Sequence, residues 1–587
     1  MADTDLIACL YPFVDLYTDG GKAKKAIEAK ANATRHAPAR LTETETEQPQ
    51  LSRRSRESTP LEQPRKKGVP AYFHHPAVEL RFSHGPKTPY GFVFGHNSNS
   101  DVVLKCGIQS VSAHHFALTF DDHYRPIVKD LGSLNGTEVT YDDQGQGWRS
   151  DFVWIIGGHR VPSGKKTIVI TINENLKFQM VVAHHDITSP QYIDNVNRFR
   201  QGTANAENLL GLLDLRRRPQ TERASGTHTP GNGPIVLKKK LGEGSFGVVT
   251  HLWNVSTADE CALKKPSKRA IREKMVEVDA WRKEAHIMGR VSHEHIVALL
   301  GSDFTSLPRL RFEYVPGGTL HDYPDLSTGE CLQILRQCLS ALVYLHGQDP
   351  PIVHRDIKPS NILVQHRHAD DIHVKLGDFG LSREGPDPTT MCGTWRYTAP
   401  ELSEEMDNRK AAHYHRRSYT LAVDIWSLGV AVFECAYDLP RRNATEVPWC
   451  EEIVKKLGDD LKRDPDDLKQ FLRDAMVILQ PTLRRTAQDC YDQAVLLADS
   501  AQDGCLTPTP AAYARGRRQP LVGRGSAEDT TTESSQNRSL EDDSAEIGRH
   551  VRSNGLPPES TAMPPPPPGR GQRIPRHLAV DLQSDEL

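Results

Sequence analysis

Residues 354–361 read His-Arg-Asp-Ile-Lys-Pro-Ser-Asn, and the apolar run Ile362-Leu363-Val364 follows directly. Asp356 stands two positions before Lys358 and five before Asn361. An aspartate can accept the proton of an attacking hydroxyl, a lysine can neutralise charge on a transferring phosphoryl group, and an asparagine carbonyl can help to hold magnesium. Eight residues alone can match this pattern by chance, so the interpretation depends on what stands on either side.

A glycine-rich stretch precedes this loop. Residues 241–249 read Leu-Gly-Glu-Gly-Ser-Phe-Gly-Val-Val between two apolar, strand-like runs. Glycines let the backbone fold closely over phosphates without a side chain intruding. A dinucleotide-binding unit would continue with a helix, whereas here a second strand-like run follows and ends at Lys264. The pattern therefore favours a loop over a nucleoside triphosphate.

In this order the motifs resemble those of the eukaryotic protein kinases. Residues 376–380 read Leu-Gly-Asp-Phe-Gly, and residues 393–401 end in Ala-Pro-Glu, as in that family. The lysine form of the 354–361 loop resembles the serine/threonine kinases. The resemblance implies a two-lobed α+β kinase domain over 234–498, ATP and Mg²⁺ as cofactors, and protein substrates phosphorylated on serine or threonine.

The resemblance also implies a role for each matching position. Asp356 would be the catalytic base, and Lys264 would hold the α and β phosphates while pairing with Glu284. Arg355 and Lys358 complete the catalytic set, and Asn361 and Asp378 would bind magnesium. The residues expected at the nucleotide are Leu241, Gly242, Glu243, Gly244, Ser245, Phe246, Gly247, Val248, Val249, Ala262, Lys264, Glu313 and Val315, the last two through their backbones.

Three further expectations concern support and control of this site. Asp424 would brace the catalytic loop, and Arg484 would pair with Glu401. Kinases of this type use the arginine that matches Arg355 to bind a phosphate on the activation segment. Thr389 and Thr390 are the residues expected to carry that phosphate.

A second resemblance lies upstream, where short strand-like runs alternate with turns and predict an all-β sandwich. Gly95-His96, the run Ser112 to His115, and Asp130 to Thr137 match the G-R, S-x-x-H and N-G-T motifs of the forkhead-associated (FHA) domain in order and spacing. That family reads phosphothreonine. The resemblance implies that His96 and Ser112 would face the phosphate and that Asn135 would hold the peptide backbone, while His115 is structural.

His96 departs from the family, because it stands where an arginine is usual. A histidine is shorter than arginine and gains its charge only near pH 6. Two interpretations stay open: a phosphopeptide site that is weak and strengthens toward pH 6, or a dimerisation or docking sandwich without that ligand. The FHA-then-kinase order resembles the DNA-damage checkpoint kinases.

Length and composition predict a multi-domain protein. A chain of 587 residues is too long to fold around a single hydrophobic core. Its 40 prolines and 25% charged residues are compatible with substantial disordered segments. The expected fold class is an all-β FHA-like sandwich followed by an α+β two-lobed kinase domain, with disordered N-terminal, linker and C-terminal segments. The expected boundaries are 1–70 mostly disordered, 71–185 sandwich, 186–233 linker, 234–498 kinase and 499–587 disordered tail.

Charge and cysteine usage narrow the function classes. A net charge of -3, from 73 basic and 76 acidic residues, gives no argument for a nucleic-acid or membrane partner. The ten cysteines form no C-x-x-C pair, which indicates a reducing compartment. We therefore expect an intracellular protein of the cytoplasm or nucleus. A rival hypothesis is a signalling scaffold that works by binding, with catalysis incidental.

Overall fold

The computed structural model describes residues 3–15, 20–40, 70–105, 111–159, 161, 165, 167–201, 231–244, 247–369, 371–381, 383–384, 395–402, 420–440 and 448–503.

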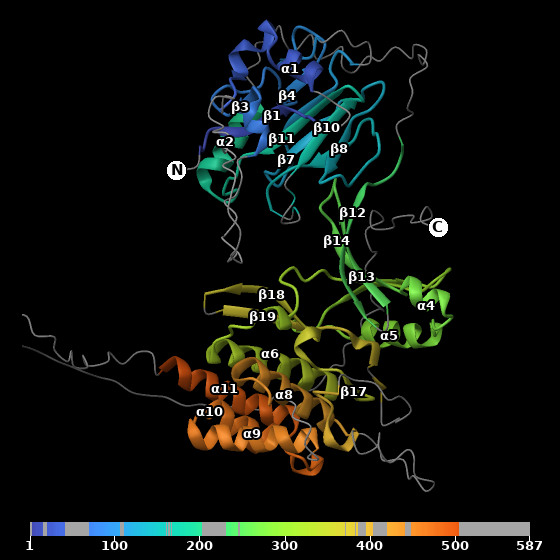
Figure 1. Cartoon of the computed structure of the whole chain (residues 1–587), viewed down its shortest axis with the longest axis vertical. Helices are drawn as coiled ribbons and strands as arrows, with labels where there is room; N and C mark the ends of the chain where they lie inside the picture. The colour runs from blue at the N-terminus through green and yellow to red at the C-terminus, as the bar shows by residue number, and fades with distance from the viewer. Residues whose placement is uncertain are drawn as a thin grey trace, which may run out of the picture. The chain divides into compact units, whose positions relative to one another are not determined.

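Two β-sheets face each other in the N-terminal part, which confirms the predicted sandwich (Figure 1). One sheet has the order β2-β3-β1-β11-β10-β8 and the other β5-β4-β6-β7-β9, and among the described strands of these two sheets only β4 and β5 pair in parallel. The strands of the first sheet are β1 Leu6–Pro12, β2 His36–Ala37, β3 Ala77–Arg81, β8 Glu138–Tyr141, β10 Ile168–Asn173 and β11 Leu176–Val182. Those of the second are β4 Phe92–Gly95, β5 Val102–Val103, β6 Phe116–Phe120, β7 Pro126–Asp130 and β9 Val153–Ile155.

Strand β1 corrects the expectation that residues 1–70 are mostly disordered. It lies between β3 and β11, with Ala8 opposite Val182 and Leu10 opposite Val78. Leu10 packs into the sandwich core on one face, whereas Tyr11 packs against Tyr72 and Phe73 on the other. Because both faces are covered, the strand reads as a continuous apolar run without alternation, which is hard to distinguish from a helix in the sequence. Residues 41–69 lie outside the described residues.

Two short helical segments after β1 also belong to the sandwich. Helix α1 Gly21–Ile27 buries Ala23, Ala26 and Ile27, and the 3₁₀ segment Lys30–Arg35 buries Asn32. The Asn32 amide donates to the carbonyl of Val103 at 3.0 Å and accepts from its N–H at 2.8 Å. A buried polar side chain satisfied in this way fixes the segment to β5.

The expected linker over 186–233 is wrong in its first part. Helix α2 Pro190–Gln201 packs on the sandwich through Tyr192, Val196 and Phe199, all buried. The Tyr192 hydroxyl donates to the carbonyl of Tyr124 at 2.9 Å. The helix predicted over 205–215 lies outside the described residues.

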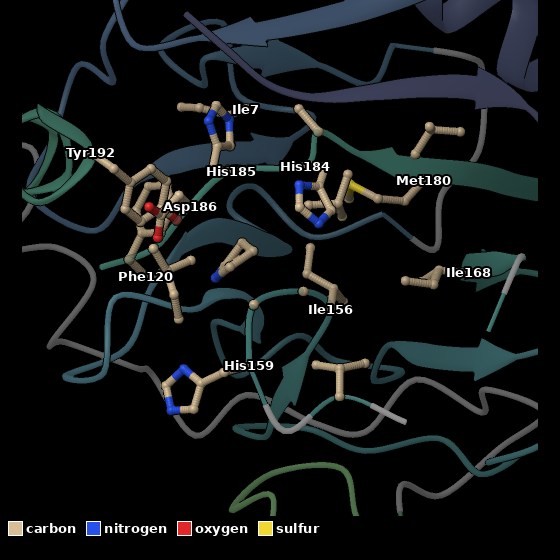
Figure 2. A pocket seen from close by; sticks show the side chains of 18 of the residues that line it. Ile7, Phe120, Ile156, His159, Ile168, Met180, His184, His185, Asp186 and Tyr192 are labelled. Atoms are coloured by element: carbon tan, nitrogen blue, oxygen red, sulfur yellow. The ribbon is translucent and has the colours of Figure 1, made fainter. Parts of the chain in front are cut away.

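A cavity of about 640 Å³ opens in the sandwich (Figure 2). Ile168 and Met180 line it from one sheet, Phe120 lines it from the other, and Tyr192 lines it from α2. None of the three residues predicted to contact a phosphopeptide lines this cavity.

A third sheet, with the order β12-β13-β14-β16-β15, forms the small lobe of the kinase domain. The small-lobe elements are β12 Val236–Gly244, β13 Gly247–Asn254, β14 Glu260–Lys265, α4 Lys268–Arg272, α5 Val278–Arg290, β15 Leu299–Asp303 and β16 Arg309–Phe312. Helix α5 turns Trp281, Glu284, Ile287 and Met288 inward at the three- and four-residue spacing of one helix face.

The large lobe is mainly helical, with α6, α8, α9 and α11 gathered together (Figure 1). Its helices are α6 Thr328–His346, α8 Ala422–Tyr437, α9 Trp449–Arg463, α10 Asp467–Phe471 and α11 Ala487–Asp503, and its strands are β17 Ile352–Val353, β18 Ile362–His368, β19 Asp371–Leu376 and β20 Arg383–Glu384. Helix α11 continues past the expected kinase boundary at residue 498, and the rest of the predicted tail lies outside the described residues. None of the described helices is both long and apolar enough to span a bilayer.

Candidate active site

Three charged side chains from distant parts of the chain meet at the centre of the kinase domain. Lys264 is the last residue but one of strand β14, Glu284 lies on helix α5, and Asp378 follows β19. The Lys264 ammonium lies 2.7 Å from Glu284 Oε1 and 2.8 Å from Asp378 Oδ1. The predicted pair of Lys264 with Glu284 is therefore formed, and the same lysine reaches the Asp378 predicted to bind metal.

Burial and charge oppose each other in this cluster. Burial alone would lower the pKa of Lys264, but the carboxylates of Asp378 and Glu284 raise it above its ordinary value. Burial raises the pKa of Glu284 despite its ammonium partner. Burial alone would raise the pKa of Asp378, but the attraction and hydrogen bond of Lys264, together with attraction to His354 and Lys358, lower it overall. Lys264 thus stays cationic and Asp378 anionic, as nucleotide and metal binding require.

The catalytic loop, residues 354–361, holds its functional groups in mutual contact. The Lys358 ammonium donates to Asp356 Oδ2 at 2.7 Å. The Asn361 amide nitrogen donates to the Asp356 carbonyl at 2.8 Å and to its Oδ2 at 3.0 Å. Because the amide nitrogen of Asn361 faces Asp356, the amide oxygen of Asn361 points away from Asp356 and can coordinate a cation.

Asp424, near the start of α8, holds the backbone of this loop through hydrogen bonds. Its fully buried carboxylate accepts from the backbone N–H groups of His354 at 2.9 Å and Arg355 at 2.8 Å, and it lies 3.0 Å from His346 Nε2. Burial alone would raise the pKa of Asp424, but His346, the charge of His354 and the Arg355 N–H lower it overall. Arg355 takes a φ of 72°, a strained backbone conformation for a non-glycine residue. The two hydrogen bonds to Asp424 hold the loop in that conformation.

The donor set fits magnesium. Asp378 offers a carboxylate whose side chain is 38% exposed, and Asn361 offers an amide oxygen. Magnesium prefers hard oxygen ligands and commonly binds one or two protein groups together with substrate phosphates. A Cβ added at Gly380 would lie 3.4 Å from both Asp378 Oδ1 and the Lys264 ammonium. The glycine therefore keeps the space beside these groups clear.

The glycine-rich loop spans the turn between β12 and β13. Gly247 has a φ of 148°, and an added Cβ would lie 2.3 Å from the Lys265 carbonyl, so packing requires glycine there. An added Cβ at Gly242 or Gly244 would meet no protein atom within 4 Å. Protein packing therefore does not explain these two glycines, and the open space beside them is compatible with the phosphate contact that the sequence predicts. Ser245 and Phe246 lie outside the described residues.

The segment after β16 holds the residues predicted to contact adenine. The N–H of Glu313 donates to the Ala298 carbonyl at 2.9 Å, and its carboxylate binds the Lys375 ammonium at 2.8 Å. Its backbone carbonyl is therefore the group that can accept a hydrogen bond from the adenine ring. Val315 lies two positions further on and is buried.

Trp281 is a site residue that the sequence reasoning missed. The Lys264 ammonium lies 5.7 Å from the centre of its ring, within cation–π range, and a Cβ at Gly247 would lie 3.1 Å from the ring edge. Trp281 precedes Glu284 by one helical turn, so the position shared with Glu284 on one helix face was the available signal.

The three loops of the predicted phosphopeptide site are joined by hydrogen bonds. The His96 N–H donates to the Ser112 carbonyl at 3.1 Å, and Ser112 Oγ accepts from the Leu134 N–H at 3.1 Å, next to Asn135. His115 is fully buried; its Nδ1 accepts from the Ser112 N–H and its Nε2 donates to the Gly136 carbonyl, both at 3.1 Å. The structure thus brings His96, Ser112 and Asn135 onto neighbouring loops. Thr389 and Thr390 lie outside the described residues.

Comparison with known proteins agrees with both parts. Residues 235–496 match the protein kinase domain family, and residues 92–146 match the FHA domain family. A probable myosin light chain kinase of Dictyostelium discoideum is 32% identical over 273 residues, which cover 44% of this chain and 72% of the relative.

Two further relatives extend the comparison. The serine/threonine-protein kinase RAD53 of Saccharomyces cerevisiae is 27% identical over 421 residues, covering 68% of this chain and 48% of the relative. The inhibitor of nuclear factor kappa-B kinase subunit beta of Rattus norvegicus is 34% identical over 250 residues, which cover 39% of this chain and 30% of the relative. The matches thus span about half or less of these two relatives.

A two-lobed fold with a Lys-Glu-Asp cluster, an H-R-D loop and a glycine-rich hairpin defines the class. The chain belongs to the protein kinase family, as the resemblance indicated. Within it, the chain stands with the serine/threonine protein kinases and carries an FHA domain ahead of the catalytic domain.

Proposed function

We propose that this protein transfers the γ-phosphoryl group of ATP to serine or threonine hydroxyls of protein substrates, and that the catalytic residues are those brought together around Lys264. The meeting of Lys264 with both Glu284 and Asp378 supports this proposal most directly. An ammonium held by two carboxylates is fixed in place before the nucleotide arrives, so its orientation requires no rearrangement during reaction.

Each group near the transferred phosphoryl then has a separate task. Asp356 Oδ2, held by Lys358 and Asn361, accepts the proton of the attacking hydroxyl. Lys358 neutralises negative charge beside it. Asp378 and Asn361 hold magnesium, which when bound neutralises charge on the β and γ phosphates. The nucleotide is enclosed by the loop glycines together with Leu241, Glu243, Val248, Val249 and Ala262.

A phosphorylation assay tests this function against that of a binding scaffold. We expect Asp356→Asn to lower kcat by about 100-fold or more, because the base is lost while the loop keeps a residue of similar shape. Nucleotide affinity should change little. A variant with unchanged kcat would assign the observed phosphorylation to another residue or protein and favour the scaffold.

We further propose that the FHA sandwich recruits phosphothreonine-containing partners through His96, Ser112 and Asn135. The hydrogen bonds that join their loops support a single binding surface. Titration of phosphothreonine peptides at pH 7.5 and pH 6 tests the proposal, with unphosphorylated peptides as controls. Absence of binding at both pH values would contradict it and favour a docking sandwich.

A further inference from the structure

The end of β13 and the turn that joins it to β14 bury three apolar side chains. Trp253, Val255 and Ala258 are 1%, 0% and 2% exposed. They share one hydrophobic cluster with residues of the FHA sandwich, and the sandwich and kinase domain belong to a single compact unit, Met1–Asp503. A turn of this kind would expose a large apolar surface in a free-standing kinase domain.

Specific contacts join the turn to the sandwich. The Ile155 N–H donates to the Val255 carbonyl at 2.8 Å, and Ser256 Oγ donates to the Val153 carbonyl at 2.6 Å. These two bonds place the turn beside β9. The Trp253 ring packs edge-on against Tyr141 of β8, with ring centres 5.8 Å apart.

The chain entering the neighbouring strand β12 is held at the same place. The Gly231 N–H donates to the Trp148 carbonyl at 2.9 Å, and Arg149 Nε donates to the Gly233 carbonyl at 3.1 Å. Leu237, opposite Trp253 in the β12–β13 register, is buried in the same cluster. Both strands of the hairpin are therefore anchored at one end.

The other end of this hairpin is the glycine-rich loop. From Leu237 the strand β12 leads to Gly244, and β13 returns from Gly247 to Trp253. In β12, all residues from Lys238 to Gly244 are exposed, so little else packs against that strand. Strand β13 also pairs with β14 from Val248 to Trp253, so the base of the hairpin and this pairing together support the loop over the nucleotide.

We propose that the FHA sandwich acts as the base of the β12–β13 hairpin, so that its contact with residues 253–258 positions the glycine-rich loop and sets the affinity for ATP. The proposal rests on the proposed function in assigning the nucleotide to this loop. The sandwich is then a structural part of the ATP site as well as a recruiting module.

A matched pair of substitutions in one turn tests the proposal. Val255→Lys places a charge in the buried contact, whereas Thr257→Lys places the same charge two residues away on an exposed side chain next to Asp259. We expect Val255→Lys to weaken binding of a non-hydrolysable ATP analogue, measured by calorimetry on the full chain, by roughly 2- to 30-fold. Thr257→Lys should bind like the unmodified protein.

Hydrogen exchange supplies a readout that is independent of catalysis. Val255→Lys should speed exchange of the β13 amides and of the Ile155 amide together, because both depend on one contact. Equal analogue affinity in the two lysine variants, with unchanged β13 exchange, would overturn the proposal. If the unmodified protein fails to bind the analogue, the proposed function fails instead.

A milder variant covers the case in which Val255→Lys does not fold. Ser256→Ala removes the bond to the Val153 carbonyl without introducing a charge. It should weaken analogue binding and accelerate β13 exchange in the same direction, by a smaller factor. Unchanged values for both quantities would likewise overturn the proposal.

Discussion

Arg484 and Glu401 lie 83 positions apart in sequence and meet through two parallel hydrogen bonds of 2.7 and 2.8 Å. The Arg484 side chain is fully buried and also donates to the carbonyls of Ala422, Ile478 and Leu479. One arginine thus fastens the end of the activation segment to two parts of the large lobe.

Removal of Glu401 should destabilise the kinase domain strongly. Glu401→Ala leaves the buried guanidinium without its counter-charge, which typically costs about 3–5 kcal/mol. Chemical denaturation measures the loss. The exposed Asp279–Arg282 pair provides the control, since Asp279→Ala should change the free energy of unfolding by less than about 1 kcal/mol.

Neutralising Glu284 should impair catalysis more than stability. Glu284→Gln keeps the shape of the side chain but removes one of the two carboxylates that hold Lys264, so the ammonium can shift away from the phosphate position. We expect kcat/KM to fall by about 10- to 100-fold. Asp279→Asn, on the same helix but exposed, should leave kcat/KM unchanged. Equal activity of the two variants would contradict a positioning role for Glu284.

The sandwich should lose stability as the pH falls below about 6.5. Burial lowers the pKa of His115 below its ordinary value of 6.5, so the unfolded chain binds more protons than the folded one below that pH. Protonation would also place an N–H at Nδ1, where the Ser112 N–H is now accepted. The free energy of unfolding should fall by at most about 1.4 kcal/mol per pH unit. His115→Gln should lose this dependence, whereas His123→Gln, at an exposed position, should retain it.

Arginine at position 96 should strengthen phosphopeptide binding. His96→Arg supplies a permanent charge and a bidentate donor, and a hydrogen bond to a charged group is worth about 1.5–3 kcal/mol, or roughly 10- to 150-fold in affinity. Binding by the unmodified protein should tighten from pH 7.5 to pH 6, and this pH effect should diminish in His96→Arg. Titrations at both pH values check this, with Ser112→Ala as the variant expected to lose affinity. A weaker His96→Arg would place the phosphate elsewhere.

Phosphorylation at Thr389 or Thr390 should raise kcat by ordering the activation segment through Arg355. The double variant Thr389→Ala, Thr390→Ala should therefore lower kcat, and Arg355→Ala should lower it to a similar extent. Because both changes act on one contact, combining them should add little further loss. Mass spectrometry of the active protein identifies the sites. An unchanged kcat in the double alanine variant would exclude this switch.

The sequence predicted the kinase cluster well because its members stand in short motifs of fixed chemistry. The family resemblance paired Lys264 with Glu284 and assigned Asp378 to magnesium, but it did not predict that Lys264 also contacts Asp378. Trp281 carries no motif of its own and was recognisable only from its helix face. The support that Lys375 gives Glu313 depends on two strands whose relative placement no local pattern reveals.

The sandwich was harder to predict at its edges. Strand β1 pairs with residues more than 160 positions away, so its local sequence contains no turn or partner signal. Helix α2 is short and mostly polar, and its three buried side chains are recognisable only against the sandwich on which they pack. The apolar character of Val255 was visible, but nothing in the sequence identified the surface that covers it.

The central position of β1 has a consequence for how the molecule is made and handled. Since Ala8 pairs with Val182 and Leu10 with Val78, the first sheet cannot be completed on the ribosome until β11 has emerged. A recombinant fragment that begins at residue 70 lacks β1, so β3 and β11 would each have an unpaired strand edge where β1 normally lies. Such edges recruit strands from other molecules, so that fragment should aggregate where one begun at residue 3 remains monodisperse.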